Sequence, residues 1–416
     1  MNTTMFDRIN AEIDARHDDA VDFLRELVRV PTDTPPGNNA PHAERTAQLL
    51  EGMGYTVERH AVPQALAQEH GLQSVTNLIV RHRFADGEKA GPTIALNAHG
   101  DVVPPGEGWT QPPYEGVVVD GQMYGRGVAV SKSDFATYLF ALEALKALHA
   151  TGVALNGTVE LHFTYDEEMG GAVGPGWLLA EQLTKPDFAI CASFSYAIVT
   201  AHNGALHLEV TVHGKSAHAA QPETGVDALR AAVGMLNALY AHQPELKSIM
   251  SKVAGISHPT LNIGRIEGGT NTNVVPGRVV FKLDRRMIPE ENPVEVEAAL
   301  RDLLEKAAAP FPGIRVEIRR LLLAHALKPL PGHGKLVAAL QKYGERVFGE
   351  AIPATGTPLY ADARRYAEAG IPTVMYGAGP RTLLESGAKR ADEHVALEDL
   401  RRATQVIANS LADLLT

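Results

Sequence analysis

The sequence predicts an α/β protein of two domains, in which a smaller α+β domain is inserted into a larger domain with a mixed sheet. Three observations predict this class. Short β-rich segments alternate with helical segments up to about residue 203, which is typical of a mixed or mostly parallel sheet covered by helices. The order then becomes β-α-β-β-α-β over 204–325, and the alternation resumes from 326. We therefore expect a large domain over 1–203 and 326–416 and an inserted domain over 204–325.

The first part of the large domain opens with helical spacing of apolar residues over 6–29, which ends before Pro31. A second helix is expected over about 41–54, closed by Gly54. The later elements follow from β-rich runs and from helical periodicity. They are strands at 55–62, 77–83 and 93–99, a helix at about 132–149, a strand at 158–165, a helix near 175–184 and a strand at 188–193.

The inserted domain begins with LHLEVTVHG, a strand with clean period-two alternation of apolar and polar residues. Its further elements are a helix at 225–242, strands at 260–269 and 278–286, a helix at 292–308 and a strand at 314–323. The chain then returns to the large domain. There we expect a helix at 333–348, a strand at 373–377 and a closing helix at 396–414.

Composition excludes several classes of function. The formal net charge is −11 and no basic stripe is visible, so we expect no nucleic-acid partner. No run approaches the roughly eighteen apolar residues of a membrane span, and the N-terminal segment carries acids without an apolar core. The single cysteine, Cys191, excludes an internal disulfide, and its apolar strand predicts a buried, inert thiol. The sequence thus favours a cytoplasmic protein without a membrane partner.

Two motifs at predicted strand ends carry candidate chemistry. In HGD, His99 ends a strand, and the Asp101 carboxylate can fix the tautomer of the His99 ring. In YDEEMGG, the adjacent carboxylates Glu167 and Glu168 can divide their work, one binding a metal and the other taking a proton from water. Each motif alone also fits a structural interpretation, as a packed histidine and a solvated acidic loop. The glycines after the acidic pair match neither GxGxxG nor a P-loop.

Taken together, the motifs are much more specific. The order HGDVVP, MYGRG, FTYDEEMGG, GKSAHAAQPETGVDAL, GGTNTNVVPG, LDRR and GIPTVMYGAGP resembles the zinc aminoacylase and carboxypeptidase family. That family includes acetylornithine deacetylase, succinyl-diaminopimelate desuccinylase and the carboxypeptidase G type. The resemblance covers essentially the whole chain. It implies a catalytic α/β domain, an inserted lid and dimerisation domain, and hydrolysis of an amide bond in a small carboxylate substrate.

The resemblance also implies a site with two zinc ions and five protein ligands, and this chain departs from it. His99 and Glu168 match two of the ligands. The bridging aspartate is replaced by Val130, a glutamate after the next strand by Ser193, and a C-terminal histidine by Lys389. Zinc sites normally use three or four N, O or S ligands. We therefore expect at most one weak zinc site, or none.

None of the three replacements is a good zinc ligand, and together they make the site more positively charged. Val130 cannot coordinate, Ser193 is a poor neutral ligand, and Lys389 could coordinate only as a free amine, which its ordinary pKa opposes. An ammonium at 389 supplies positive charge that a metal would have supplied. Because a buried carboxylate needs a partner, we expect Lys389 to pair with Glu168.

Two alternatives keep a metal. A different register near the C-terminus would let His394 serve as a ligand. Asp134 could compensate for Val130, although it lies about a helical turn beyond the bridging position.

The remaining residues of the family pattern are present. The resemblance makes Glu167 the general base, with Asp101 beside it, and His218 a stabiliser of the oxyanion, often across a homodimer interface. Asn273 and Arg286 match residues that hold the substrate, and a guanidinium suits a carboxylate by bidentate pairing. Asp362 matches a structural aspartate of the large domain.

Three functions of different classes follow. The first is family-type hydrolysis of an amide in a small N-acyl amino acid or dipeptide-like carboxylate, with Glu167 as the base and either a residual metal or Lys389 with His218 as the electrophile. The second is metal-free acid–base chemistry, an isomerase or lyase reaction that uses Glu167 and Lys389. The third is a pseudoenzyme that binds a small carboxylate without turnover. A serine nucleophile, Ser131 or Ser193 beside Lys389 or Lys132, is a weaker variant of the first.

Overall fold

The computed structural model describes residues 4–84, 91–382 and 384–416. The chain divides into two compact units. The large domain contains the chain up to Thr200 together with Pro329–Thr355 and Ala361–Thr416, and the inserted domain contains Ala201–Lys328 with Gly356–Tyr360. The division is discontinuous in sequence, like the division expected at 203/204 and 325/326. The short segment Gly356–Tyr360 was not anticipated as part of the inserted domain.

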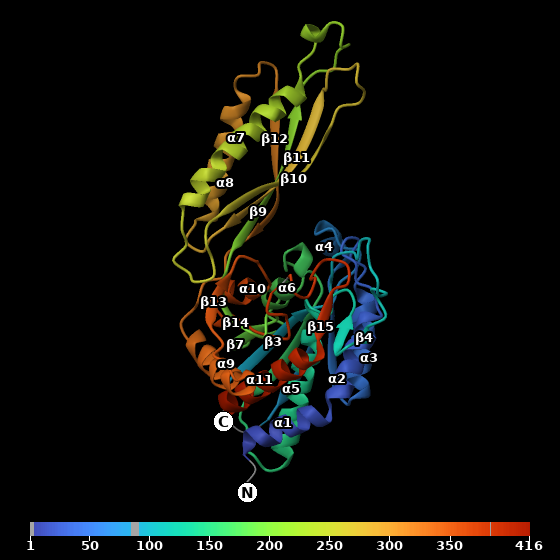
Figure 1. Ribbon diagram of the computed structural model, residues 1–416, viewed down its shortest axis with the longest axis vertical. Helices are drawn as coiled ribbons and strands as arrows, with labels where there is room; N and C mark the ends of the chain where they lie inside the picture. The colour runs from blue at the N-terminus through green and yellow to red at the C-terminus, as the bar shows by residue number, and fades with distance from the viewer. Residues whose placement is uncertain (1–3, 85–90, 383) are drawn as a thin grey trace. The chain divides into compact units, whose positions relative to one another are not determined.

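The large domain is built on a mixed sheet of eight strands, which confirms the predicted class (Figure 1). Strand β3 is parallel to β6 and β7, β7 is parallel to β14, and β2 is antiparallel to β6. In sheet order the strands are β1 (Val57–Ala61), β2 (Thr76–Arg83), β6 (Thr158–Thr164), β3 (Thr93–His99), β7 (Phe188–Cys191), β14 (Thr373–Met375), β8 (Ile198–His202) and β13 (Ala354–Thr357).

Helix α5 (Lys132–Ala150) packs against β3 and β6 and contacts three other helices. These are α1 (Met5–Ala15), α2 (His17–Val28) and α11 (Leu397–Leu415), and α11 also contacts α9 (His333–Phe348). The single helical segment expected over 6–29 is therefore two helices, which separate at Arg16. The other helices are α3 (Ala40–Gly52), α4 (Gln64–Glu69), α6 (Pro175–Ala180) and α10 (Ala363–Glu368).

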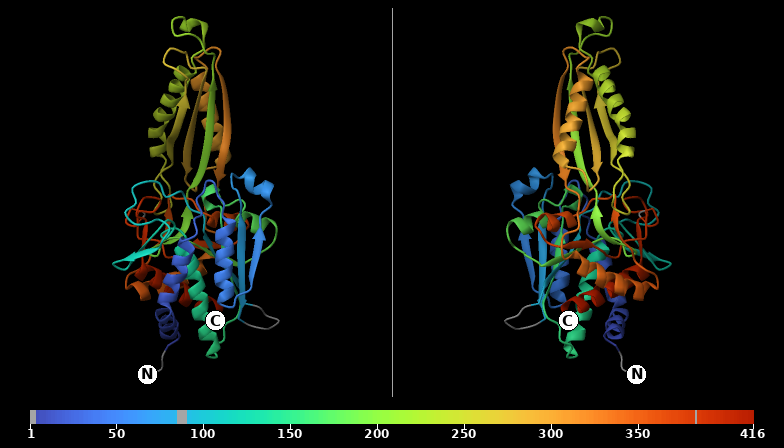
Figure 2. Two further views of the ribbon diagram at one scale, coloured as in Figure 1. Left: turned by 90° about the vertical axis from the view of Figure 1, so that its right-hand side faces the viewer. Right: turned by 90° about the vertical axis from the view of Figure 1, so that its left-hand side faces the viewer.

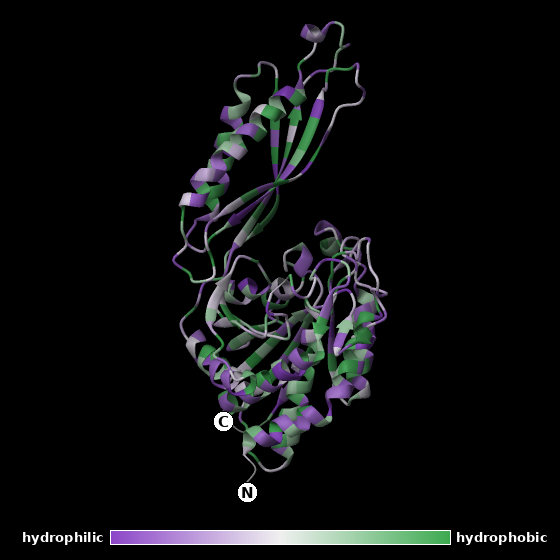
Figure 3. Cartoon of the chain, viewed as in Figure 1, coloured by the Kyte–Doolittle hydropathy of each residue, from purple (hydrophilic) through white to green (hydrophobic). Residues whose placement is uncertain are grey.

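The inserted domain has the predicted β-α-β-β-α-β order. It runs through β9 (Gly204–His213), α7 (Ala228–Ser248), β10 (Thr260–Gly268), β11 (Arg278–Met287), α8 (Pro293–Ala308) and β12 (Arg315–Ala324). The antiparallel sheet has the order β10-β11-β9-β12, and both helices cover one face of it (Figure 1, Figure 2). Leu206, Leu208 and Val210 are fully buried against the helices, whereas the intervening His207 and Glu209 are partly exposed. Hydrophilic and hydrophobic stretches alternate along the strands of this sheet (Figure 3).

A third, small sheet was not predicted. Its strands β4 (Val117–Val119), β5 (Gln122–Tyr124) and β15 (His394–Ala396) have three residues each and pair in the order β15-β5-β4. The pairing of His394 with Tyr124 brings the C-terminal loop beside the segment that follows β5. Two 3-10 turns complete the fold, at Glu167–Met169 and Pro222–Thr224. Among the helices that the structure describes, none has the length and apolarity to cross a membrane.

Candidate functional site

The two sequence motifs meet at one edge of the large sheet. His99 is the last residue of β3 and pairs in register with Thr164, the last residue of the parallel strand β6. The chain beyond β6 then enters the 3-10 turn that carries Glu167 and Glu168. Because the carboxyl ends of parallel strands form the usual ligand-binding edge of an α/β sheet, this edge is the candidate active site.

Asp101 organises the acidic pair. Its carboxylate is fully buried and accepts the backbone N–H of Glu167 at 3.2 Å and that of Glu168 at 2.9 Å. The carbonyl oxygen of Asp101 lies 3.0 Å from His99 Nδ1, and its carboxylate Oδ1 lies 3.4 Å from the same nitrogen. On the other side of the ring, His99 Nε2 lies 3.8 Å from Glu167 Oε2. One aspartate thus fixes both the imidazole and the two carboxylates.

The pKa values reflect a crowded, buried set of charges. Burial alone would lower the pKa of His99, but the carboxylates of Glu167, Asp101 and Glu168 raise it to about 10. Burial is also the largest influence on Glu168 and raises its pKa to about 7, even though the Lys389 ammonium acts in the opposite direction. The carboxylates around His99 therefore favour the protonated form of its ring, against the effect of burial.

Lys389 donates a hydrogen bond from Nζ to Glu168 Oε2 at 2.7 Å, so the pair expected from the sequence is present in the structure. The carboxylate side chain is only 10% exposed, but the lysine side chain is 53% exposed. Its carboxylate neighbours, Glu168 first, raise the pKa of Lys389 against the effect of burial. Lys389 also has a backbone φ of 62°, in the left-handed region that residues other than glycine rarely adopt.

The loop that carries Lys389 is anchored by the residues that follow it. Asp392 accepts the backbone N–H of Thr110 at 2.8 Å and that of Gln111 at 3.1 Å. Glu393 is buried and accepts Arg126 Nη1 at 2.5 Å. It also accepts two backbone N–H groups from the segment after Arg126, at 3.0 and 3.1 Å. These contacts fix the register that places residue 389, and no other residue of this loop, on Glu168.

The other two replaced positions also lie near His99. Val130 precedes Ser131, whose Oγ accepts the backbone N–H of His99 at 3.2 Å. Ser193 lies two residues beyond Cys191, which pairs in register with Asn97 of β3, and His99 lies two residues beyond Asn97. Val130 and Ser193 thus lie on segments next to the end of β3, and Lys389 reaches the same edge through Glu168.

These residues do not fit a pair of zinc ions. In the described ranges 4–84, 91–382 and 384–416, no three His, Cys, Asp or Glu side chains are grouped to hold a metal ion. His99 and Glu168 are the two family ligands that the sequence keeps, and Glu168 is already bonded to an ammonium. A valine, a serine and a lysine at the other three positions offer no ligand of the kind that zinc prefers.

The two residues considered as substitute ligands have other partners. Asp134 is buried on α5, and its Oδ1 accepts the backbone N–H of Ala378 at 2.7 Å. Burial raises the pKa of Asp134 to about 7. The ring of His394 lies 5.1 Å from the ring of Tyr124, and its Nδ1 is 2.9 Å from the carbonyl of Asp392. The structure thus does not support the shifted register in which His394 takes the place of Lys389.

Lys132 and Asp362 are buried groups near this edge. Lys132 Nζ donates to the carbonyls of Val30 at 3.1 Å and Leu27 at 3.4 Å, and burial lowers the pKa of Lys132 to about 7. Asp362 begins α10, and burial with the Asp166 carboxylate raises the pKa of Asp362 well above its usual range. A Cβ on Gly171 would lie 2.1 Å from Asp362 Oδ1, so the glycine after the acidic pair permits this close approach.

The inserted domain contains the remaining predicted residues. His218 and Asn273 are exposed on adjacent loops, which join where the Ala219 N–H donates to the Asn273 carbonyl at 3.0 Å. Arg286 is half-buried on β11. Its Nε donates to the Asp284 carboxylate at 3.0 Å, and its guanidinium carbon lies 5.1 Å from the centre of the Tyr360 ring. Asp284, Tyr360 and Arg126 were not singled out from the sequence.

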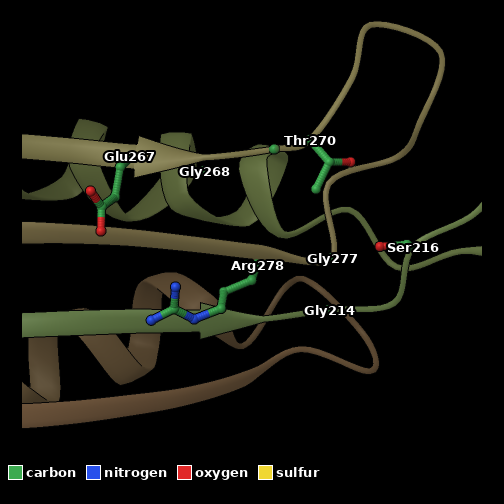
Figure 4. Close-up of a pocket in the computed structure, with 8 residues that line it drawn as sticks. Gly214, Ser216, Glu267, Gly268, Thr270, Gly277 and Arg278 are labelled. Carbon is green, nitrogen blue, oxygen red and sulfur yellow. The ribbon is translucent and has the colours of Figure 1, made fainter.

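The inserted domain also has an open cavity of about 580 Å³ (Figure 4). It lies where β9 and β10 end and β11 begins. Its lining residues are Gly214, Ser216, Glu267, Gly268, Gly269, Thr270, Gly277 and Arg278. None of the residues predicted to carry chemistry lines this cavity, so we place the candidate site at the edge of the large sheet instead.

Comparisons with known proteins show the family of the chain. The model of peptidase family M20/M25/M40 matches residues 95–413. A succinyl-diaminopimelate desuccinylase of Gluconacetobacter diazotrophicus is 26% identical over 408 residues, 95% of this chain and 97% of the relative. An acetylornithine deacetylase of Proteus mirabilis is 28% identical over 372 residues, 86% of this chain and 88% of the relative.

Solved structures show the same fold at low sequence identity. Human carnosine dipeptidase 1 has a TM-score of 0.74 at 19% identity, covering 99% of both chains. The di-peptidase Dug1p of Saccharomyces cerevisiae has a TM-score of 0.80 at 14% identity, covering 100% of this chain and 99% of the other. A Bacillus subtilis protein described as a dinuclear metal-binding peptidase has a TM-score of 0.66 at 19% identity, covering 97% of this chain and 99% of the other.

Proposed function

The chain belongs to peptidase family M20/M25/M40, and from this membership we propose that it hydrolyses an amide bond in a small N-acyl amino acid or dipeptide-like carboxylate. The observation that carries the proposal is the cluster of His99, Asp101 and Glu167 at the joined ends of β3 and β6. A base held in place by a buried carboxylate is what water attack on an amide requires. The first relatives named above remove acyl groups from amino acids, which supports this substrate class.

In the proposed reaction, Glu167 takes a proton from water while the water oxygen adds to the amide carbonyl carbon. The carbon–nitrogen bond then breaks, and the proton passes from Glu167 to the leaving amine. Lys389 and His218 stabilise the developing oxyanion, and Asn273 and Arg286 hold the substrate carboxylate. The proposal includes at most one weak zinc site, at His99 and Glu168, or none.

We propose a homodimer joined through the inserted domain, because His218 matches a residue that acts across a dimer interface in the family. The single cysteine favours a cytoplasmic location.

A panel of N-acetyl and N-succinyl amino acids and dipeptides tests this function, with the released amine measured by fluorescamine. We expect turnover of at least one member and a loss of about 100-fold or more in the E167Q variant, which keeps the shape of the side chain but not the base. Equal turnover by E167Q would contradict the role of Glu167. No amine release from any compound, with a rise in melting temperature on adding one, would indicate a binding protein.

A second function is favoured by one observation, the Lys389–Glu168 ion pair beside Glu167. An ammonium and a carboxylate in contact can serve as an acid–base pair for isomerisation or elimination. Incubating the same panel in D2O and following each C–H signal by NMR distinguishes the two reactions. Exchange or loss of a C–H without amine release would favour the isomerase or lyase function over the hydrolase.

A further inference from the structure

The three replaced ligand positions all change the charge of the site in one direction. Compared with the aspartate, glutamate and neutral histidine of the family pattern, Val130, Ser193 and Lys389 each make the site one unit more positive. Two zinc ions carry four positive charges, so the three replacements together offset most of the charge that the ions bring. Replacement of a carboxylate by any neutral residue has this sign, so the informative change is at 389, where a residue with a positive charge stands in place of a neutral histidine.

The positive charge of Lys389 lies beside Glu168, a family metal ligand whose carboxylate needs a cation as its partner. Glu168 is 10% exposed, and a buried carboxylate without a partner is costly. Lys389 Nζ donates to its Oε2 at 2.7 Å. An arriving metal ion would have to displace this ammonium before it could bind Glu168, so the retained ligand is already occupied by the protein itself.

The fold holds this ammonium in position. Lys389 adopts a left-handed backbone conformation, with φ at 62°, which is unfavourable for a residue with a Cβ. The contacts of Asp392 and Glu393 keep the loop in this conformation. The lysine side chain is nevertheless 53% exposed, and one hydrogen bond, to Glu168, uses one of the three N–H donors of its ammonium.

We propose that Lys389 is a resident cation that replaces the metal pair of the family, so that the site is built around a lysine–glutamate pair and is not a metal centre that has lost its ions. One N–H of the ammonium neutralises Glu168, and the others are donors for an anionic or carbonyl oxygen of a bound ligand. The ligand role rests on the proposed function, whereas the charge replacement holds whichever reaction the site performs.

The test compares the full-length protein with V130D/S193E/K389H, the variant that restores all five family ligands. After incubation with zinc and dialysis, bound metal is measured by plasma mass spectrometry, and melting curves are recorded with zinc and with a chelator. We expect no stoichiometric zinc in the natural protein and one or more equivalents in the variant. We also expect zinc to raise the melting temperature of the variant alone. One or two tightly held equivalents in the natural protein would overturn the proposal.

A double-mutant cycle provides a second test that does not depend on the triple variant folding. We expect K389M to lower the melting temperature by about 2–4 °C, because Glu168 loses its partner, and K389M/E168Q to recover most of this loss. Independent, additive losses would contradict a functional pair. Neither test uses a substrate, so an inactive protein without zinc would sink the hydrolase proposal alone, and an active zinc protein would sink this inference alone.

Discussion

Two ion pairs join the same C-terminal loop to the rest of the large domain, and they differ in their exposure to solvent. In the Arg126–Glu393 pair, both side chains are no more than 2% exposed, and Glu393 accepts two further backbone N–H groups. In the Lys389–Glu168 pair, four residues earlier, the carboxylate is buried but the lysine side chain is half-exposed. The comparison separates two uses of charge. A fully enclosed pair fixes the loop, and a half-open pair leaves donors of the cation accessible to a ligand.

The largest effect is expected from breaking the enclosed pair. E393Q keeps the shape of the side chain but leaves the Arg126 guanidinium buried without a counter-charge. We expect a loss of about 3–5 kcal/mol in the free energy of unfolding, measured by urea titration. The double variant R126M/E393Q serves as the control and should recover part of the loss. A loss of less than about 1 kcal/mol in E393Q would show that this pair does not anchor the loop.

The Lys389–Glu168 pair should make the free energy of unfolding depend on pH. Glu168 has a pKa of about 7 in the folded protein, above its ordinary 4.5, so unfolding releases a proton between these pH values. Stability contributed by this group therefore falls as pH rises from about 4.5 to 7.

The E168Q variant lacks this titration. Compared with E168Q, the natural protein should lose about 1–3 kcal/mol of unfolding free energy between pH 5 and pH 7.5, by urea titration at each pH. A difference between the two proteins that stays constant with pH would contradict the raised pKa.

The smallest effect is expected from a pair that is open on all sides. Lys306 and Asp302 on α8 are 74% and 59% exposed and lie one turn apart. We expect D302N to change the unfolding free energy by no more than about 0.5 kcal/mol, and added salt to abolish the difference. A larger effect would mean that exposure does not rank the three pairs, and the comparison drawn above would fail.

The sequence predicted those parts of the fold whose signal is local. The alternation in β9 and the helical period of α8 each extend over ten or more residues, and both elements lie where they were expected. The three-residue strands β4, β5 and β15 were missed. So short a run has no period of its own, and β15 is stabilised by a partner about 270 residues earlier in the chain.

In the candidate site, too, residues within local motifs were predicted from the sequence, whereas contacts between distant segments were not. Motif spacing placed His99, Glu168 and Lys389, because each motif is a continuous stretch of sequence. It did not reveal Arg126 as the partner of Glu393, although one signal was present: an arginine within the buried run 125–129 needs a counter-charge. Nor did it reveal that Asp134 bonds to Ala378, since the two residues meet only in the folded sheet.

The interrupted course of the large domain has a consequence for the order of biosynthesis. The segment Ala201–Lys328 is nearly a complete unit, and all of its strands leave the ribosome before Pro329 does. The large domain, in contrast, needs its last helix, since α11 packs on α1, α5 and α9. During translation the inserted domain can therefore fold before the large domain has been completely synthesised. The two halves of the candidate site, His99 and Lys389, come together only after the segment that contains Lys389 and α11 has been synthesised.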